Sequence, residues 1–189
     1  MLVIAVCGRA GSGKTTVAKL FAKKLGSTFI EVSEVVRSHA LANERIEDTL
    51  GESHESRKIL QDEIKHQTDP NWLYNSITSV FPKGKDTDEA TIIISGLRDP
   101  YVAYKLMNDF QFMLIRVDVS ALVRYGRLAT RDGYISIEEM RTVDVRDSDL
   151  GLDLIMTYPY ALPINGDKTI EVISERVDKY CYDIVEARK

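Results

Sequence analysis

The stretch VCGRAGSGKTT, residues 6–16, decides how the rest of the sequence is interpreted. Gly8, Gly13, Lys14 and Thr15 match the spacing G-x-x-x-x-G-K-[ST], and Gly11 is a third glycine within it. Glycines at this spacing let the backbone curl so that successive N–H groups point inward at an anion. A following helix adds the positive end of its dipole. The stretch therefore predicts a phosphate-binding loop between a strand and a helix.

The residues on either side of the loop have the patterns that such a loop requires. Residues 1–8 form a continuous apolar run, typical of a buried parallel strand. Residues 14–26 carry apolar side chains at helical spacing and end at Gly26, which suits a helix C-cap. In this context we expect bound ATP, with Lys14 on the β- and γ-phosphates and the Thr15 hydroxyl on Mg²⁺. The residues expected to hold the nucleotide are Gly8, Gly11, Ser12, Gly13, Lys14, Thr15 and Thr16.

Strand and helix patterns alternate along the remaining chain. Further strands are expected at 28–32, 90–96, 111–119 and 162–165. Helices are expected at 34–66 (two, broken near Gly51), 71–81, 100–110, 121–131 and 168–187. The charged region 132–150 shows no continuous apolar stripe. This order predicts one domain over residues 1–189, a three-layer α/β/α fold with a mainly parallel sheet and right-handed crossovers. Ligands of such a sheet bind at the carboxyl ends of its strands.

Length and composition agree with one soluble domain. The chain has 189 residues, of which 44% are hydrophobic and 29% are charged, with a formal net charge of −4. This charge does not favour nucleic acid or an anionic membrane, although a local basic cleft stays possible. No segment approaches the ~18 apolar residues of a membrane span. Two distant cysteines, Cys7 and Cys181, give no disulfide framework, and a reduced cytoplasmic setting is expected. The sequence indicates no particular oligomeric state.

Arginines after the loop are placed to form a second phosphate site. Arg37 lies in the helical segment after the second expected strand, and Arg98 directly follows the strand at 90–96. Guanidinium groups make forked contacts with phosphate oxygens, so they can bind an acceptor and screen a transferred phosphoryl group. The chain is short for a motor domain and shows no N-K-x-D-like guanine reader, which favours a kinase. Further arginines follow at Arg127 and Arg131, which share a helix face, and at Arg141 and Arg146.

Together these segments resemble the nucleoside monophosphate kinase group of P-loop kinases. That group includes adenylate kinase-like, phage-type deoxynucleoside monophosphate kinase-like and dephospho-CoA kinase-like proteins. FIEVSEVVR and IIISGLRDP resemble the segments whose arginines bind the acceptor phosphate, and RLATR resembles the arginine pair that opens a mobile lid. The resemblance implies a helical acceptor-binding insert at about 33–80 and a short lid at about 127–150.

The resemblance also implies roles for individual side chains. Arg37 and Arg98 would bind the acceptor, and Glu34 stands where the family often has aspartate. Lys14, Arg98, Arg127 and Arg131 would act on the transferring phosphoryl group, with Arg141 and Arg146 helping from the lid. One position departs from the family pattern. The end of the strand at 90–96 usually carries an acidic residue that helps to hold Mg²⁺, and here it is Ser95, so Ser95 itself, Asp99 or Asp118 would take that task.

The sequence therefore predicts an ATP-dependent kinase that phosphorylates a small (deoxy)nucleoside monophosphate. One alternative phosphorylates a hydroxyl, on a dephospho-CoA-like metabolite or a hydroxymethylated DNA base, with Glu31, Glu34 or Asp99 as base. An alternative of another class is an ATP-binding regulator with little turnover.

The histidines and large aromatic residues fit structural positions better than chemical ones. His39, His54 and His66 do not have the spacing of a metal site and are expected on the surface or in the acceptor insert. Trp72 is expected to anchor the core, with stacking on an acceptor base as the other option. Tyr101 and Tyr104 are expected to pack rather than to select a base.

Overall fold

A computed structural model describes residues 1–42, 59, 62, 64, 67–83, 89–132 and 136–188 of the chain. Within these residues, five strands form one sheet in the order β2-β3-β1-β4-β5, and each neighbouring pair is parallel. The strands are β1 Leu2–Cys7, β2 Thr28–Glu31, β3 Thr91–Ser95, β4 Gln111–Asp118 and β5 Leu162–Asn165. The central strand β1 is buried along its whole length, as its continuous apolar run predicts.

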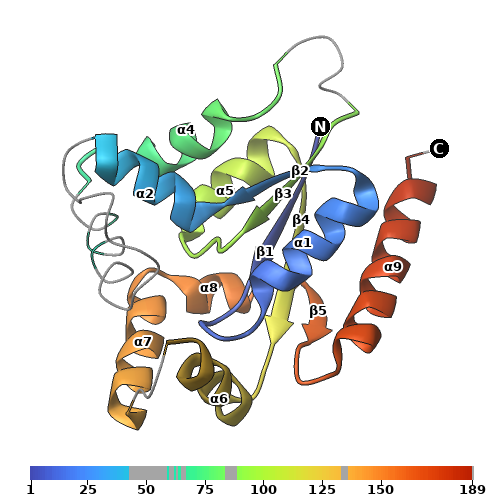
Figure 1. The fold of residues 1–189 in the computed structure, drawn as a ribbon. Coiled ribbons are helices and arrows are strands. Elements are labelled where there is room, and N and C mark those ends of the chain that lie inside the picture. The colour runs from blue at the N-terminus through green and yellow to red at the C-terminus, as the bar shows by residue number, and fades with distance from the viewer. Residues whose placement is uncertain are drawn as a thin grey trace.

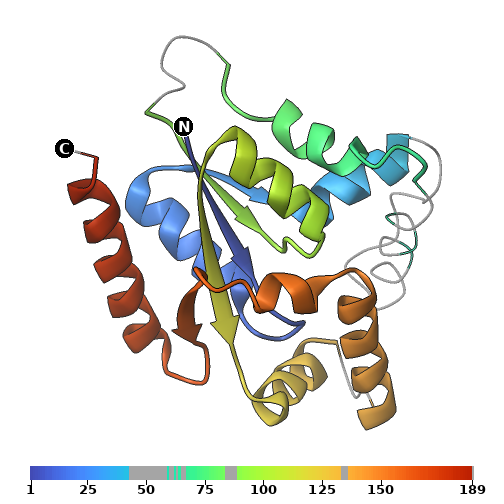
Figure 2. The same ribbon diagram turned by 180° about the vertical axis from the view of Figure 1, so that it is seen from behind.

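Helices cover both faces of this sheet (Figures 1 and 2). They are α1 Lys14–Leu25, α2 Val32–Ala42, α4 Trp72–Ser79, α5 Pro100–Asp109, α6 Ala121–Asp132, α7 Ile137–Asp149, α8 Leu152–Met156 and α9 Ile170–Glu186. The side chains of β1 alternate between the two faces. Those of Leu2, Ile4 and Val6 pack with α1 and α9, and those of Val3 and Ala5 pack in the core that includes α2, α4, α5 and α8. The predicted three-layer α/β/α fold is confirmed.

The carboxyl ends of the parallel strands lie at one edge of the sheet, and the loop at residues 8–13 emerges there from β1. Helices α6 and α7 lie beyond this edge, below the ends of β1 and β4 in Figure 1. No helix in the described parts of the chain has both the length and the apolar character needed to cross a bilayer.

The predicted strands and most predicted helices are present, with boundaries shifted by one or two residues. The second expected strand ends at Glu31, because α2 already begins at Val32. The helix break near Gly51 lies outside the described residues, as do His54 and His66.

The largest difference between sequence and structure is at 132–150. Most of this charged region is the helix α7, which begins with a capping box between Ser136 and Glu139. Its buried residues are Met140 and Asp147, so the inward face is partly polar and gives no apolar stripe. The short helix α8 was also not predicted. The capping box was the available signal for α7.

Candidate functional site

The glycine-rich loop has the backbone conformation that its sequence predicts. Gly11 and Gly13 have φ angles of 76° and 83°, in the left-handed region that favours glycine. A Cβ atom on Gly11 would lie 2.7 Å from the carbonyl oxygen of Arg124, so the loop packs directly against α6. The loop leads into the N-terminus of α1 at Lys14. The N-terminal end of this helix is a favourable position for phosphate.

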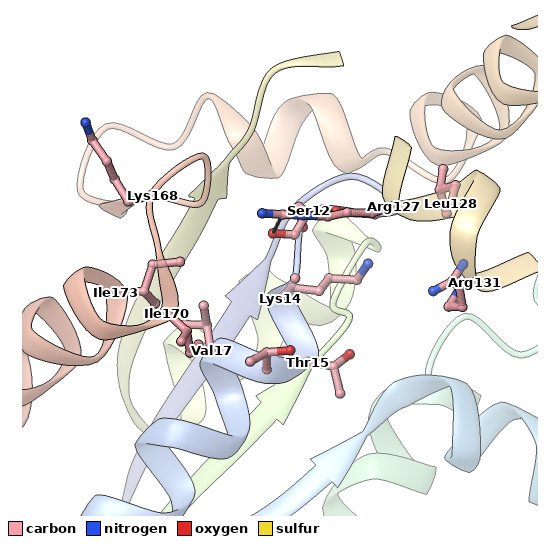
Figure 3. Close-up of a pocket in the computed structure, with 13 residues that line it drawn as sticks. Ser12, Lys14, Thr15, Val17, Arg127, Leu128, Arg131, Lys168, Ile170 and Ile173 are labelled. Carbon is pink, nitrogen blue, oxygen red and sulfur yellow. Dashed lines mark hydrogen bonds between the residues drawn. The ribbon is translucent and has the colours of Figure 1, made fainter. Parts of the chain in front are cut away.

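A pocket of about 320 Å³ lies between the loop, α6 and the start of α9 (Figure 3), and we call it the α9-side pocket. Arg127 crosses the loop within it. One terminal nitrogen of Arg127 donates to the carbonyl oxygens of Gly11 and Ser12 at 3.4 and 3.3 Å, and the other donates to that of Gly166 at 2.8 Å. Arg127 thus joins the loop to the turn after β5. The lining residues are Gly11, Ser12, Gly13, Lys14, Thr15, Thr16, Val17, Arg127, Leu128, Arg131, Lys168, Ile170 and Ile173.

A second pocket of about 450 Å³ lies on the other side of Lys14, against α2, and we call it the α2-side pocket. It contains Glu34, Arg37 and Arg98, the residues expected to bind the acceptor. Its lining residues are Ala10, Gly11, Lys14, Thr15, Lys19, Phe29, Glu31, Val32, Ser33, Glu34, Val36, Arg37, Ile64, Arg98 and Arg131. The two pockets share Gly11, Lys14, Thr15 and Arg131.

Lys14 lies where the two pockets meet. In Figure 3 its side chain extends from the start of α1 towards Arg131. Burial lowers the pKa of Lys14 to about 8, and the nearby charges of Arg98 and Arg131 act in the same direction, while Asp147 and Glu31 oppose them. Several cations are therefore held close together, an arrangement that an anionic ligand would stabilise.

Thr15 is hydrogen-bonded to side chains from two neighbouring strands. Its hydroxyl donates to Glu31 Oε2 at 3.0 Å and accepts from the buried Ser95 hydroxyl at 3.3 Å. A Cβ atom on Gly96 would lie 2.9 Å from Glu31 Oε1, so the glycine leaves room for this carboxylate. The carboxylate beside Thr15 is thus Glu31, at the end of β2.

Asp99 and Asp118, which the sequence offered as replacements for the missing acid, have other partners. Asp99 caps α5 by accepting from the Tyr101 N–H at 2.8 Å. The carboxylate of Asp118 accepts from Arg116 Nε at 2.9 and 3.0 Å. The parallel pairing of β2 with β3, which places Glu31 opposite Ser95, would have identified Glu31 earlier.

Arg98 makes an ion pair with Asp147 of α7, with 2.8 Å between Nε and Oδ1. Asp147 is fully buried, and its second oxygen accepts the backbone N–H of Ala10 at 3.0 Å. One carboxylate therefore joins the glycine-rich loop to an arginine of the α2-side pocket. Sequence reasoning missed Asp147, because it is one of several acidic residues in a polar region.

A second ion pair attaches α7 to α6 and the loop. The buried guanidinium of Arg124 donates to both oxygens of Asp144 at 2.8 and 2.7 Å, and to the carbonyl oxygen of Ala10 at 3.1 Å. Burial of Asp144 acts to raise its pKa, but the hydrogen bonds and charge of Arg124 outweigh this, and the pKa is lowered. Arg9 adds contacts to Asp153 at 2.5 Å and to the Asp144 carbonyl at 3.2 Å. The sequence did not indicate this network either.

The structure does not bring the two lid arginines to either pocket. Arg141 has a 68% exposed side chain and lies 3.5 Å from Glu138 of the same helix. Arg146 is not among the described residues that line the α9-side or α2-side pocket. Trp72 is buried in the core next to the His39 ring, with 4.6 Å between ring centroids. The Tyr101 hydroxyl donates to Asn71 at 2.7 Å, and Tyr104 is exposed.

Solved structures with the same architecture include a gluconokinase, a sugar kinase and an uncharacterized protein. A gluconokinase from Sinorhizobium meliloti 1021 matches with 15% identity and a TM-score of 0.63, covering 98% of this chain and 94% of that one. A sugar kinase from Janibacter sp. HTCC2649 matches with 19% identity and a TM-score of 0.52, covering 93% and 90%. An uncharacterized protein from Eubacterium ventriosum ATCC 27560 has 14% identity and a TM-score of 0.59, covering 96% and 98%. At these identities the likeness shows the P-loop kinase fold.

The chain belongs to the AAA_18 family, described as an AAA domain, whose model matches residues 4–144. The match begins in β1 and ends within α7, so it includes the glycine-rich loop and the residues that the two pockets share, among them Lys14 and Arg131. Family and fold together place the protein among P-loop proteins that have the architecture of small-molecule kinases. A search of curated protein sequences found no match.

Proposed function

We propose that the protein transfers the γ-phosphoryl group of ATP to the phosphate of a small (deoxy)nucleoside monophosphate. The observation that supports this most directly is the meeting of two pockets at Lys14, Thr15 and Arg131. Their volumes, about 320 and 450 Å³, lie in the ~300–1,000 Å³ range of small-molecule sites. Two substrates bound in adjoining pockets would place donor and acceptor phosphates together at these three side chains.

The α9-side pocket suits the donor. The triphosphate would lie on the loop N–H groups and Lys14, and the base would lie between Arg127 and the apolar side chains of Ile170 and Ile173. The Thr15 hydroxyl would bind Mg²⁺, with Glu31 next to it as the carboxylate that orients the metal's water ligands.

The α2-side pocket suits an anionic acceptor. Among the described residues its lining includes five basic side chains, Lys14, Lys19, Arg37, Arg98 and Arg131, and two carboxylates, Glu31 and Glu34. This excess of positive charge matches an acceptor phosphate. Phe29 and Val36 provide apolar surface for the rest of the acceptor. In this proposal the insert at 33–80 contributes α2 to the acceptor side, and the region 127–150 covers the loop.

The reaction requires little covalent help from the protein. A phosphate acceptor is already an anion, so it attacks the γ-phosphoryl group without a general base. Lys14 and Arg131 would stabilise the charge on the transferring group, and Arg98 would hold the acceptor in line. Both cysteines are unpaired thiols, in keeping with the reducing cytoplasm that we propose as the setting.

A panel of acceptors tests this proposal. Ribo- and deoxyribonucleoside monophosphates, gluconate and dephospho-CoA are each incubated with ATP and Mg²⁺ while ADP formation is followed. We expect ADP formation to depend on a nucleoside monophosphate. ADP release without any acceptor, or none with every acceptor, would contradict the proposal, and tight ATP binding without turnover would fit a regulator instead.

A hydroxyl acceptor is the second candidate, because two carboxylates lie in the same pocket. Glu31 accepts a hydrogen bond from Thr15 and lies beside Lys14, where a general base would act on a bound hydroxyl. The similar gluconokinase and sugar kinase keep this option open. Glu31→Gln separates the two. If Glu31 is a general base, its replacement should lower kcat by about 10²–10⁴-fold at saturating Mg²⁺. If Glu31 only orients the metal's ligands, its replacement should mainly raise the Mg²⁺ concentration that the enzyme needs, by about 10–100-fold.

A further inference from the structure

We propose that Asp147 is a positioning residue for the acceptor, whose buried carboxylate fixes Arg98 relative to the glycine-rich loop. The inference rests on the proposed function in one respect, namely that Arg98 binds the acceptor phosphate. Asp147 belongs to α7, far from both the loop and Arg98 in sequence.

The position of Asp147 is unusual for a charged side chain. It is fully buried, and its two oxygens have different partners: Oδ2 accepts from the Ala10 N–H at 3.0 Å, and Oδ1 lies 2.8 Å from Arg98 Nε. A buried carboxylate without partners is strongly destabilising, so the loop amide and the arginine together explain how it is tolerated.

The contact with Arg98 depends on charge. Neither Arg98 Nε nor Asp147 Oδ1 makes a hydrogen bond, although the two atoms are only 2.8 Å apart. The interaction is thus an ion pair, and a neutral amide at position 147 would lose it while keeping an oxygen for Ala10. Because Asp147 contacts Nε, the two terminal nitrogens of Arg98 are the donors left for a ligand in the α2-side pocket, which Arg98 lines.

The cluster of positive charges in this pocket gives a physical reason for such an anchor. Lys14, Arg98 and Arg131 are close enough for the two arginines to lower the pKa of the lysine, and Asp147 opposes this effect. Without a fixed anion, repulsion from Lys14 and Arg131 would favour an Arg98 side chain turned away from them. Asp147 therefore keeps Arg98 in place before the acceptor arrives, which lowers the ordering cost of binding.

The same helix supplies a matched control one turn earlier. Asp144 also forms an ion pair with a guanidinium, that of Arg124. The same guanidinium donates to the carbonyl oxygen of Ala10, so Asp144 is linked to the loop through Arg124. Arg124 is not among the described residues that line the α2-side pocket. Asp144 and Asp147 thus share the attachment of α7 to the loop, and only Asp147 contacts an acceptor arginine.

The test compares Asp147→Asn, Asp144→Asn, Arg98→Met and the double variant Asp147→Asn/Arg98→Met. We expect Asp147→Asn to raise the acceptor KM by at least about tenfold and to leave the ATP KM within about twofold. Asp144→Asn should lower thermal stability without this change in acceptor KM. In the Arg98→Met background, Asp147→Asn should have little further effect on the acceptor KM, because the guanidinium that Asp147 positions is already absent. The inference would be overturned if the effects of the two substitutions on the acceptor KM were fully additive, or if Asp147→Asn shifted the acceptor and ATP KM values equally.

A binding measurement separates this inference from the proposed function. Diadenosine pentaphosphate has a polyphosphate long enough to enter both pockets, whereas the non-transferring ATP analogue AMP-PNP is a probe of the donor pocket. Asp147→Asn should weaken the binding of diadenosine pentaphosphate at least about tenfold more than the binding of AMP-PNP, as measured by calorimetry with no turnover required. Equal weakening of both contradicts the role of Asp147. If Asp147→Asn shows this difference in binding but the wild-type protein phosphorylates no acceptor, the proposed function alone would be overturned.

Discussion

The glycine-rich loop with its flanking β1 and α1, and the α6–α7 region that covers it, are held together by different forces. Around the loop, side chains such as Ile4, Val17 and Phe21 are completely or almost completely buried in an apolar core. Around α7, charged groups make the contacts: Arg124 of α6 pairs with Asp144, and Arg98 pairs with Asp147, which also accepts from the Ala10 N–H of the loop. The first region is expected to set the fold, and the second to adjust the site.

The largest expected effect is at Lys14. Lys14→Met should lower acceptor-dependent kcat by at least about 10³-fold, because the charge that faces the transferring phosphoryl group is lost. The fold should persist, since the substitution removes a partly buried amine and leaves the apolar core intact. Steady-state kinetics and a thermal melt check both halves of this expectation. A melting temperature that falls sharply would show that the loop lysine is structural.

Two arginines of the covering region should differ strongly from each other. Arg131→Ala should reduce kcat by about 10²-fold, since Arg131 lines both pockets. Arg141→Ala is the matched control, and its effect should stay below about twofold, because the 68% exposed Arg141 contacts Glu138 in the structure. If both variants lose activity equally, α7 must move so that Arg141 reaches the phosphates.

The stabilising contribution of the charged contacts around α7 should depend on pH, whereas that of the apolar core around the loop should not. The pKa of Asp144 is lowered in the folded protein, so its stabilising contribution is present above its unfolded pKa of 3.8 and is lost as pH falls through the lower, folded value. Asp144→Asn should therefore cost about 1–3 kcal/mol near pH 7 and progressively less below pH ~4. Ile93→Val, in the apolar core, should cost about 0.5–1.5 kcal/mol at every pH. Urea unfolding at several pH values measures both, and identical pH profiles would contradict the distinction.

The smallest expected effect is the pH dependence of ADP binding. The pKa of Lys14 is lowered to about 8 by burial and by Arg98, and a bound phosphate favours the charged amine. Affinity should be constant below pH 8 and fall above it by up to about tenfold per pH unit. Calorimetry in Mg²⁺-free buffer measures this, with Lys14→Arg as the control that should remove the decline. Constant affinity from pH 7 to 9.5 would place Lys14 away from the phosphates.

The same contrast explains what the sequence could predict. The apolar runs and the glycine spacing identified the sheet, α1 and the loop, because burial and left-handed backbone leave strong local signals. Arg98 and Arg131 could be chosen from their positions after a strand and on a helix face. Asp144, Asp147 and Arg124 could not, because each owes its burial to a partner distant in sequence. The position of Glu31 opposite Ser95 could have been predicted from the pairing of the two strands. The exposed position of Arg141 on α7 could be seen only in the structure.

The central claim is that the two pockets hold a donor and an acceptor across Lys14, Thr15 and Arg131. ³¹P NMR of the wild-type protein with ATP, Mg²⁺ and the best nucleoside monophosphate of the panel tests it most directly. The account predicts that the γ-phosphate resonance of ATP disappears while the resonances of two nucleoside diphosphates grow in equal amounts. Growth of inorganic phosphate in place of the second diphosphate, with or without acceptor, would contradict it.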